Sequence, residues 1–430
     1  MPQAPRIVVP AAALLPHPPN DTPPPVPSPA TADDEARPYT LVPPPKPLAD
    51  KVADLNIEDP KLEQRKLQHK SAAKHPLLLR ATHRELLEDL RGEEPPPVVY
   101  LDSRGPNYGK TTQMGLLSEA LPRDVLRLDF GPMHPLLRRG LYVEWLPDEE
   151  VGTVPSISRG LLYRFLATNI PGKLSAEGET VPDPASSLLH ELKLPGAGAS
   201  LFDDLVATLQ DSTPEAACGL LAPLLDACYS GDLGCRIVAF YDGLDSSMPF
   251  PEGYVESLGS KGKRDVTWAS MYYINDYYDA ERAIPVEHLA WTKPLFTPEG
   301  DLRLLPAGST IVASSSNGDY PVSRGIRNDA HMRLRRNTTE AGGKIVKLHA
   351  YDEGEFMAVM QGAMAYNLGI FSGWAYNEEQ FEKFVASGDD FEVERDFEKI
   401  GKALNIATAR DIGVRSQLVP GEVFKTLMIV

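Results

Sequence analysis

Residues 98–112 read VVYLDSRGPNYGKTT, and this stretch decides the fold that we expect for the chain. Its first four residues form a short apolar run of the kind that makes a buried strand, and polar residues and glycines follow. From Lys110 to Leu121 the composition is helical. A strand, a glycine-containing loop and a helix in this order are the setting that a phosphate-binding loop requires.

The loop matches the second half of the phosphate-loop pattern G-x-x-x-x-G-K-[ST]. Gly109, Lys110 and Thr111 are in place, whereas Arg104 stands where the first glycine belongs and Gly105 comes one position late. In such loops backbone N–H groups surround the phosphates, the lysine neutralises their charge and the hydroxyl holds magnesium. A plain surface loop is the alternative, but the placement between strand and helix favours a phosphate site. The candidate ligands are Gly105, Asn107, Tyr108, Gly109, Lys110, Thr111 and Thr112.

Asp242 is the candidate carboxylate beside the magnesium ion. It ends the apolar run Ile237–Tyr241, where phosphate-loop proteins place an acidic residue that orients metal-bound water. Gly243 follows, so the glutamate that often polarises the attacking water is missing there, and Asp245 is the nearest substitute. The alternative is a strand-end turn, because Asp-Gly is a common turn pair. Thr111 and Asp242 are the metal candidates.

The remaining chain continues the alternation of strands and helices. Apolar runs predict strands at 125–130, 235–241, 309–314 and 344–349, and the composition predicts helices at 200–210 and 214–229. The expected fold class is therefore α/β: a P-loop NTPase-like parallel sheet covered by helices, with a small helical C-terminal domain and an extended N-terminal arm. Polar residues 314–317, after one strand, could face a γ-phosphate, although a plain loop would look the same.

Composition divides the chain into four parts. Residues 1–50 hold sixteen of the 41 prolines, which prevents regular helix or sheet pairing there. The expected parts are a proline-rich extended arm (1–60), a basic helical segment (61–96), the phosphate-loop core (97–350) and a lid-like helical domain (351–430). The arm could equally be a linker without a partner, and the basic segment a solvated helix face.

The charge balance limits the partners. With 43 basic and 60 acidic residues the net charge is −17, so any RNA contact must be local. The strongest basic patch lies between residues 324 and 347, and it could meet RNA phosphates, face a bound nucleotide or form a mobile charged hairpin. The RNA-contact candidates are Arg324, Arg327, Arg333, Arg335 and Arg336.

The sequence lacks the signals of several other classes of protein. The three cysteines have neither zinc-site nor disulfide-framework spacing, and no apolar run reaches the roughly 18 to 20 residues of a membrane-spanning helix. The motifs of α/β-hydrolases, zinc proteases and dinucleotide-binding dehydrogenases are also missing from the sequence. We therefore expect neither those enzyme activities nor a membrane partner.

Four stretches together carry a family resemblance. VVYLDSRGPNYGKTTQ, IVAFYDGLD, AIPVEHLAWTKPLF and GSTIVASSSNGDYP occur in this order. The chain resembles, from about residue 75 onward, the death-associated GTP-binding protein family of the mitochondrial ribosomal small subunit, whose P-loop core is related to AAA-type ATPases. It departs from the family's phosphate-loop pattern at Arg104.

The resemblance implies a structural rather than an enzymatic role. It implies a component of the small-subunit head in mitochondria, in contact with ribosomal RNA and neighbouring ribosomal proteins. It also implies a bound purine nucleotide, GTP/GDP or ATP, with Mg²⁺ and little or no hydrolysis. The main alternative is an active, soluble P-loop ATPase or GTPase that acts as a switch or mechanoenzyme, and a third is a scaffold without nucleotide.

Overall fold

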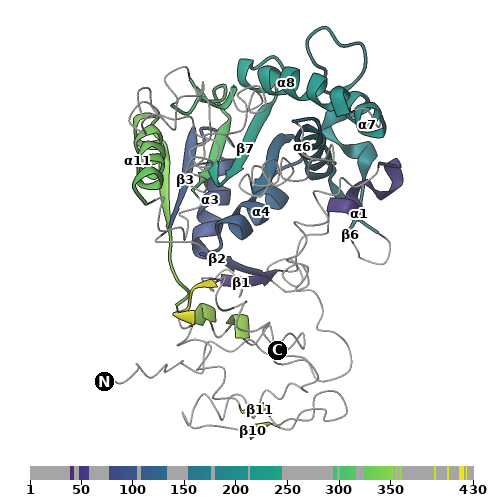
Figure 1. Ribbon diagram of the computed structural model, residues 1–430. Coiled ribbons are helices and arrows are strands. Elements are labelled where there is room, and N and C mark those ends of the chain that lie inside the picture. Colours follow the sequence, from purple (N-terminus) through teal and green to yellow (C-terminus); the bar gives the residue numbers. More distant parts are fainter. Residues whose placement is uncertain are drawn as a thin grey trace, which may run out of the picture.

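The computed structural model gives a parallel α/β core with helices on both sides of a central sheet (Figure 1). Within the described residues, no helix combines the length and the apolar character that crossing a bilayer requires. The structure describes residues 39–42, 48–57, 77–103, 108–132, 154–175, 180–211, 214–244, 294–297, 301–315, 324–352, 354–356, 358–360, 392–393, 404–405, 416–420 and 423.

Five strands form the central sheet, and every predicted strand is confirmed. Their order across the sheet is β4-β7-β8-β3-β9, and all neighbouring pairs are parallel. Their carboxyl ends therefore meet at one edge. The strands are β3 (Val98–Ser103), β4 (Val125–Pro132), β7 (Arg236–Asp242), β8 (Thr310–Ser314) and β9 (Lys344–Leu348).

The strand order has a switch point between β3 and β8. The chain leaves β3 through helix α4 (Lys110–Ala120) to the far strand β4, and then returns through β7 and β8. From β8 it passes through α11 (Arg324–Glu340) over β3 to the opposite edge, β9. The connection that leaves β3 therefore runs toward β4, whereas the connection that leaves the neighbouring strand β8 runs the opposite way, toward β9. In open α/β sheets, ligands bind outside the carboxyl ends of strands at such a point.

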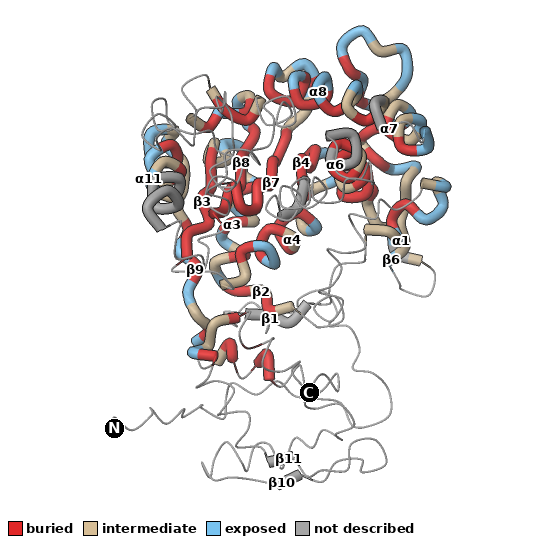
Figure 2. Tube along the Cα trace, in the orientation of Figure 1, coloured by how far each residue is buried: buried red, intermediate tan, exposed pale blue. Residues whose placement is uncertain are grey.

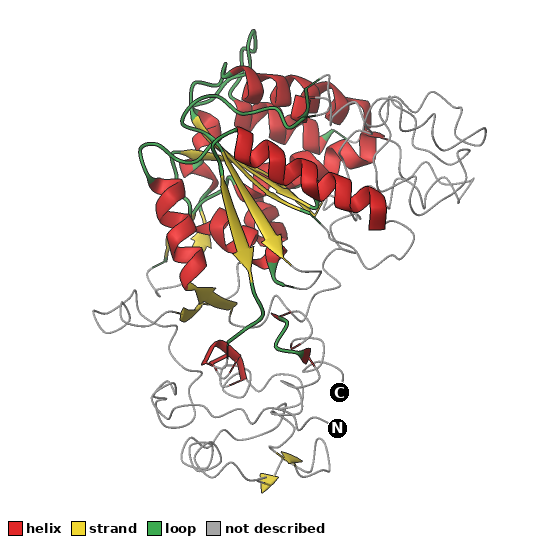
Figure 3. Ribbon diagram, turned by 90° about the vertical axis from the view of Figure 1, so that its left-hand side faces the viewer, coloured by secondary structure: helices red, strands yellow, loops and turns green. Residues whose placement is uncertain are grey.

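Alternating residues of the strands pack into two separate cores. On β3, Val99 and Leu101 join α3 (Ala81–Arg91) and α4, whereas Val98 and Tyr100 join the core on the opposite face. Successive strand residues point to opposite faces, so near-continuous apolar runs cover both sides of a buried parallel sheet. The turned view in Figure 3 shows helices on both sides of the sheet, and Figure 2 shows the inner strands β3, β7 and β8 as almost wholly buried, whereas the edge strand β9 is partly exposed.

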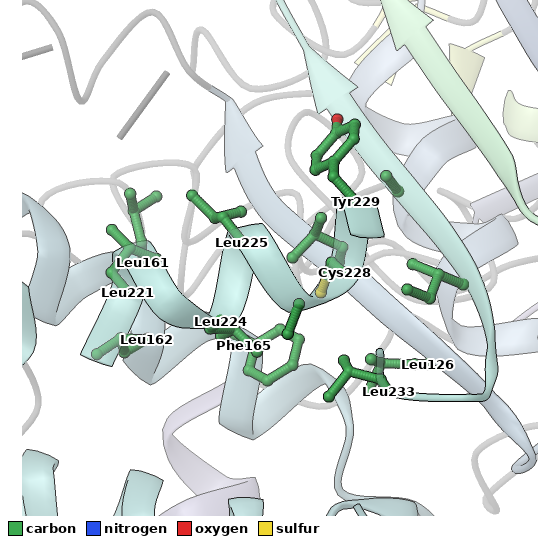
Figure 4. Close-up of a cluster of buried hydrophobic side chains, with 14 of the residues drawn as sticks. Leu126, Leu161, Leu162, Phe165, Leu221, Leu224, Leu225, Cys228, Tyr229 and Leu233 are labelled. Atoms are coloured by element: carbon green, nitrogen blue, oxygen red, sulfur yellow. The ribbon is translucent and has the colours of Figure 1, made fainter. Parts of the chain in front are cut away.

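The second core lies among three helices that cover the sheet on the side away from α3 and α4. They are α6 (Val154–Thr168), α7 (Leu201–Gln210) and α8 (Pro214–Ser230). Phe165 lies between Leu224 of α8 and Leu126 of β4 in Figure 4. The predicted helices at 200–210 and 214–229 are confirmed, and Ser200 caps α7 by accepting from the N–H of Asp203 at 3.2 Å.

Arginines secure the carboxyl end of α4. Arg127 donates to the carbonyls of Ser118 at 2.7 Å and Leu121 at 2.6 Å, and Arg91 donates to Ala120 at 2.7 Å. Cations at this end complement the helix dipole and satisfy carbonyls that have no partner within the helix. The opposite end of α4, which carries the positive pole of the dipole, begins at the predicted phosphate loop.

The N-terminal part contains structure that the sequence prediction did not include. Within the expected extended arm, β1 (Tyr39–Val42) pairs antiparallel with β2 (Leu77–Arg80), and α1 (Leu48–Val52) buries Val52 in the core. Lys51 of α1 reaches Glu119 of α4 at 2.5 Å. Aromatic and β-branched residues between the prolines favour the strand. Residues 1–38 and 58–76 lie outside the described residues.

The remaining elements are short. After α1 comes a 3-10 turn (Ala53–Leu55), and β5 (Gly172–Leu174) pairs with β6 (Thr180–Pro182) before two more 3-10 turns, Pro184–Ser186 and Leu188–His190. β10 (Glu392–Val393) pairs with β11 (Leu404–Asn405). Most of the expected C-terminal helical domain (351–430) lies outside the described residues.

Candidate functional site

The predicted phosphate loop ends at Gly109, whose backbone has a left-handed conformation. Its φ is 83°, a value that glycine adopts without steric cost, and α4 begins at the next residue. The N–H of Gln113 donates to the carbonyl of Gly109 at 2.9 Å, which closes the first helical turn. Gly105 and Asn107 lie outside the described residues. Tyr108 is half-buried and packs against the core formed with α3 and α4.

Lys110 lies inside this loop rather than on the surface. Its side chain is buried, and Nζ donates to Oγ of Ser103, the last residue of β3, at 2.7 Å. The loop is therefore bridged at its base by the lysine of the predicted motif. An ammonium group held at a helix N-terminus creates a positive potential that favours an anion.

Thr111 and Asp242, predicted to share a metal site, are in direct contact. Thr111 Oγ1 donates to Asp242 Oδ2 at 2.5 Å, although the two residues are 131 positions apart. The other carboxylate oxygen, Oδ1, accepts from Ser314 Oγ at 2.6 Å. The N–H of Gly243 donates to the same Ser314 hydroxyl at 3.0 Å. Strand ends of β7 and β8 thus place a carboxylate beside the first turn of α4.

The group combines the parts that a magnesium-bound phosphate requires. Among the residues that the structure describes, no three of the types His, Cys, Asp and Glu lie together as a metal cluster. Magnesium does not need such a cluster, because it keeps several waters and takes one or two protein oxygens together with phosphate oxygens. Thr111 can supply a direct oxygen and Asp242 can hold a metal-bound water. Thr112 is exposed on the next position of the helix.

A second polar group lies at the carboxyl end of β3, on the opposite face. Asp102 has Arg335 Nη1 at 3.7 Å and His331 Nε2 at 3.8 Å, both from α11. Tyr100 OH forms hydrogen bonds with His331 Nδ1 at 2.6 Å and with Ser315 Oγ at 2.7 Å. Sequence reasoning missed this group. A carboxylate at the end of the apolar run VVYL was the available signal, but its partners come more than two hundred residues later.

The predicted RNA-contact arginines all lie on α11, a helix rather than a charged hairpin. The side chains of Arg324 and Arg327 are outside the described residues. Arg336 Nη2 is 3.0 Å and Arg333 Nη2 4.0 Å from Asp301 Oδ1, and Arg335 pairs with Asp102. Arg336 is exposed, and because exposed ion pairs contribute little free energy, this arginine can exchange partners.

His83 gives the region around α4 an expected pH dependence. Its Nδ1 is 3.0 Å from Oε1 of Gln113 in the first turn of α4, and burial lowers its pKa from 6.5 to about 4. Above pH 6.5 the residue is neutral in both states and contributes no pH dependence. As the pH falls toward 4, the unfolded chain takes up a proton that the folded chain resists, so the free energy of unfolding falls by up to roughly 3 kcal/mol.

Urea unfolding at a series of pH values from about 7 to 4 measures this loss of stability. His83→Gln should flatten the dependence, while His190→Gln, at an exposed histidine, should leave it as in the wild type. Identical curves for His83→Gln and the wild type would contradict the assignment.

Comparison with known proteins finds no family model and no curated protein that matches the chain. The class that the fold establishes is an α/β protein with a five-stranded parallel sheet covered by helices. Within that class, the site at the carboxyl ends of β3, β7 and β8 is defined by its side chains: a buried lysine, a hydroxyl and a carboxylate around a helix N-terminus.

Proposed function

We propose that this chain is a P-loop-type protein that binds a purine nucleotide, GTP/GDP or ATP, together with Mg²⁺, as a structural ligand. The contact between Thr111 and Asp242 carries the proposal. It joins the hydroxyl of the loop helix to the acidic end of a strand that is not adjacent to β3 in the sheet. Phosphate-loop proteins hold a magnesium ion with a hydroxyl and an acidic residue from these two positions.

The phosphate end of the ligand finds several complementary groups. The first turn of α4 presents backbone N–H groups and the positive end of the helix dipole, and Lys110 adds a full charge. When phosphates bind, Lys110 exchanges its hydrogen bond with Ser103 for phosphate oxygens, which is a stronger, charge-assisted interaction. The arginines at the far end of α4 keep that helix intact while its N-terminus holds an anion.

Little hydrolysis is the second part of the proposal. The residue after Asp242 is Gly243, with φ of 74° and its N–H bonded to Ser314. A glutamate that polarises the attacking water is therefore missing from the position where many P-loop enzymes carry it. Ser314, the polar residue from the neighbouring strand, holds Asp242 instead. These contacts suit a site that retains nucleotide rather than one that cycles it.

The expected result in a turnover assay is slow release of phosphate. With saturating magnesium and GTP or ATP, we expect rates well below the typical enzyme range of about 1 to 1000 per second. Phosphate release measured at steady state on the full chain checks this. A rate inside that range would favour the alternative of an active ATPase or GTPase, in which Asp245 or Arg335 would complete the catalytic set.

The setting that we propose is the small subunit of the mitochondrial ribosome. The resemblance of the four motif stretches supports it, as do the arginines of α11 in an otherwise acidic chain. A structural nucleotide also fits a fixed subunit that gains stability from a ligand. Sedimentation of the native protein from its own cell extract tests the setting. Movement with a large ribonucleoprotein supports it, whereas a free species of its own mass at moderate salt contradicts it.

A further inference from the structure

A C-terminal turn in an unusual backbone conformation lies within the described residues 416–420. The N–H of Val419 donates to the carbonyl of Ser416 at 3.0 Å, and the two residues between them, Gln417 and Leu418, have φ of 50° and 58°. Side chains other than glycine, asparagine and aspartate rarely adopt this left-handed region. Two in succession persist when the surroundings hold them there.

The turn packs against the last residue of the phosphate loop. Gly109 has no Cβ atom, and a Cβ built at this position would lie 3.9 Å from the Cβ of Pro420, so Pro420 lies next to the open side of the glycine. Pro420 is buried, and Gly109 is the residue immediately before Lys110. The turn therefore lies beside the peptide whose orientation decides where the first N–H groups of α4 point.

The chain that follows β9 anchors the turn. The N–H of Tyr351 donates to the carbonyl of Leu418 at 2.8 Å, and the Tyr351 ring lies under the Arg80 guanidinium, 5.6 Å from its centroid. Arg80 in turn forms a bidentate ion pair with the buried Glu355, at 2.7 and 2.8 Å. A hydrogen bond of 2.9 Å from the N–H of Val423 to the carbonyl of Val419 continues the turn.

We propose that the Ser416–Pro420 turn is a part of the nucleotide site, where it positions the phosphate loop through Pro420, which lies beside Gly109. This rests on the proposed function of the loop. A loop that wraps phosphates must hold Gly109 in its left-handed conformation, and the turn restricts the movement of that residue. A nucleotide bound by the loop favours the same conformation of Gly109 that the docked turn favours. The nucleotide and the docked turn therefore stabilise each other, and the coupling is reciprocal.

Two substitutions at Gln417 distinguish the effect of its backbone conformation from the effect of its side chain. Gln417 is exposed, so Gln417→Gly and Gln417→Val both remove the same solvent-facing amide group. Glycine fits a φ of 50°, whereas the β-branched valine strongly disfavours it and opens the turn. We expect a fluorescent, N-methylanthraniloyl-labelled GTP with magnesium to bind the valine variant about 10-fold more weakly than the glycine variant.

The stabilisation of the turn by nucleotide can be measured separately on the full-length wild type. Hydrogen exchange of the backbone N–H groups of Val419 and Val423 should slow when the labelled GTP and magnesium are added, more than exchange in α7, which lies far along the sheet. General stabilisation of the fold by the ligand would not produce this difference, because it would slow exchange in α7 as well as in the turn.

The possible failures are distinguishable. If the wild type binds no labelled GTP, the proposed function fails and the inference falls with it. A second outcome is that the wild type binds labelled GTP while the glycine and valine variants bind it equally well and hydrogen exchange in the turn does not change with the ligand. In that case nucleotide binding stands, and the proposed role of the turn is wrong. Equal weakening of both variants would place the Gln417 side chain itself on the ligand, and positioning by the turn would again be wrong.

Discussion

Replacing Lys110 with alanine is expected to remove the stabilisation that nucleotide confers on the folded chain. A ligand at 100 times its dissociation constant adds about 2.7 kcal/mol to the free energy of unfolding, and this gain should disappear because the ammonium group is the main charge facing the phosphates. Without ligand the variant should differ less from the wild type, because removing the Lys110 side chain loses its hydrogen bond to Ser103 but also relieves the cost of burying a charge.

Thermal unfolding with and without magnesium and GTP or ATP measures this difference. Lys193→Ala is the matched control, because Lys193 is exposed and donates a long hydrogen bond of 3.4 Å to the carbonyl of Gly198. The control should keep the full ligand-induced shift. A shift in Lys110→Ala equal to that of the wild type would support a scaffold that no longer uses the loop.

Replacing Arg80 with methionine should produce the largest loss of stability in the protein without ligand. The change leaves Glu355 buried without its cation, and it removes donors from the carbonyls of His349 and Ala350. Breaking a buried ion pair by removing one partner costs about 3 to 5 kcal/mol, because the remaining charge keeps its desolvation penalty.

Urea unfolding of Arg80→Met at neutral pH measures the loss. Arg123→Met is the control, since Arg123 is exposed and donates to a single carbonyl, that of Gly172. Adding Glu355→Leu to Arg80→Met should recover part of the stability, because an apolar pair replaces an unpaired buried charge. A loss in Arg80→Met no larger than in the control would show that the pair contributes little.

The central sheet could be predicted from the sequence because its signals are local. Apolar runs such as Val98–Leu101 and Ile237–Tyr241 lie between polar residues and glycines, and a buried parallel strand requires such a run. The motif also named Thr111 and Asp242 as candidates for one metal site, and the structure brings the two side chains together at the edge where the carboxyl ends of the parallel strands meet. The left-handed Gly109 follows from the same motif.

The contacts that could not be predicted join residues far apart in the chain. Arg80 and Glu355 are separated by 275 positions, and neither stands in a pattern that names its partner. The pairing of Asp102 with Arg335 of α11 is also long-range and has no local signal. Helix α6 was missed for another reason, because its apolar residues lie between long segments of mixed composition. Local patterns specify elements, whereas a single long-range ion pair depends on the packing of the whole fold.

The nucleotide content of the purified native protein shows most directly whether the chain retains a purine nucleotide. Denaturing the full chain, isolated without added nucleotide, and separating the supernatant by chromatography identifies any purine nucleotide that the phosphate loop retained. We expect a guanine or adenine nucleotide in amounts close to the protein concentration, and none from the Lys110→Ala variant. A wild-type protein that releases none, and that neither GTP nor ATP with magnesium stabilises afterwards, would contradict the account.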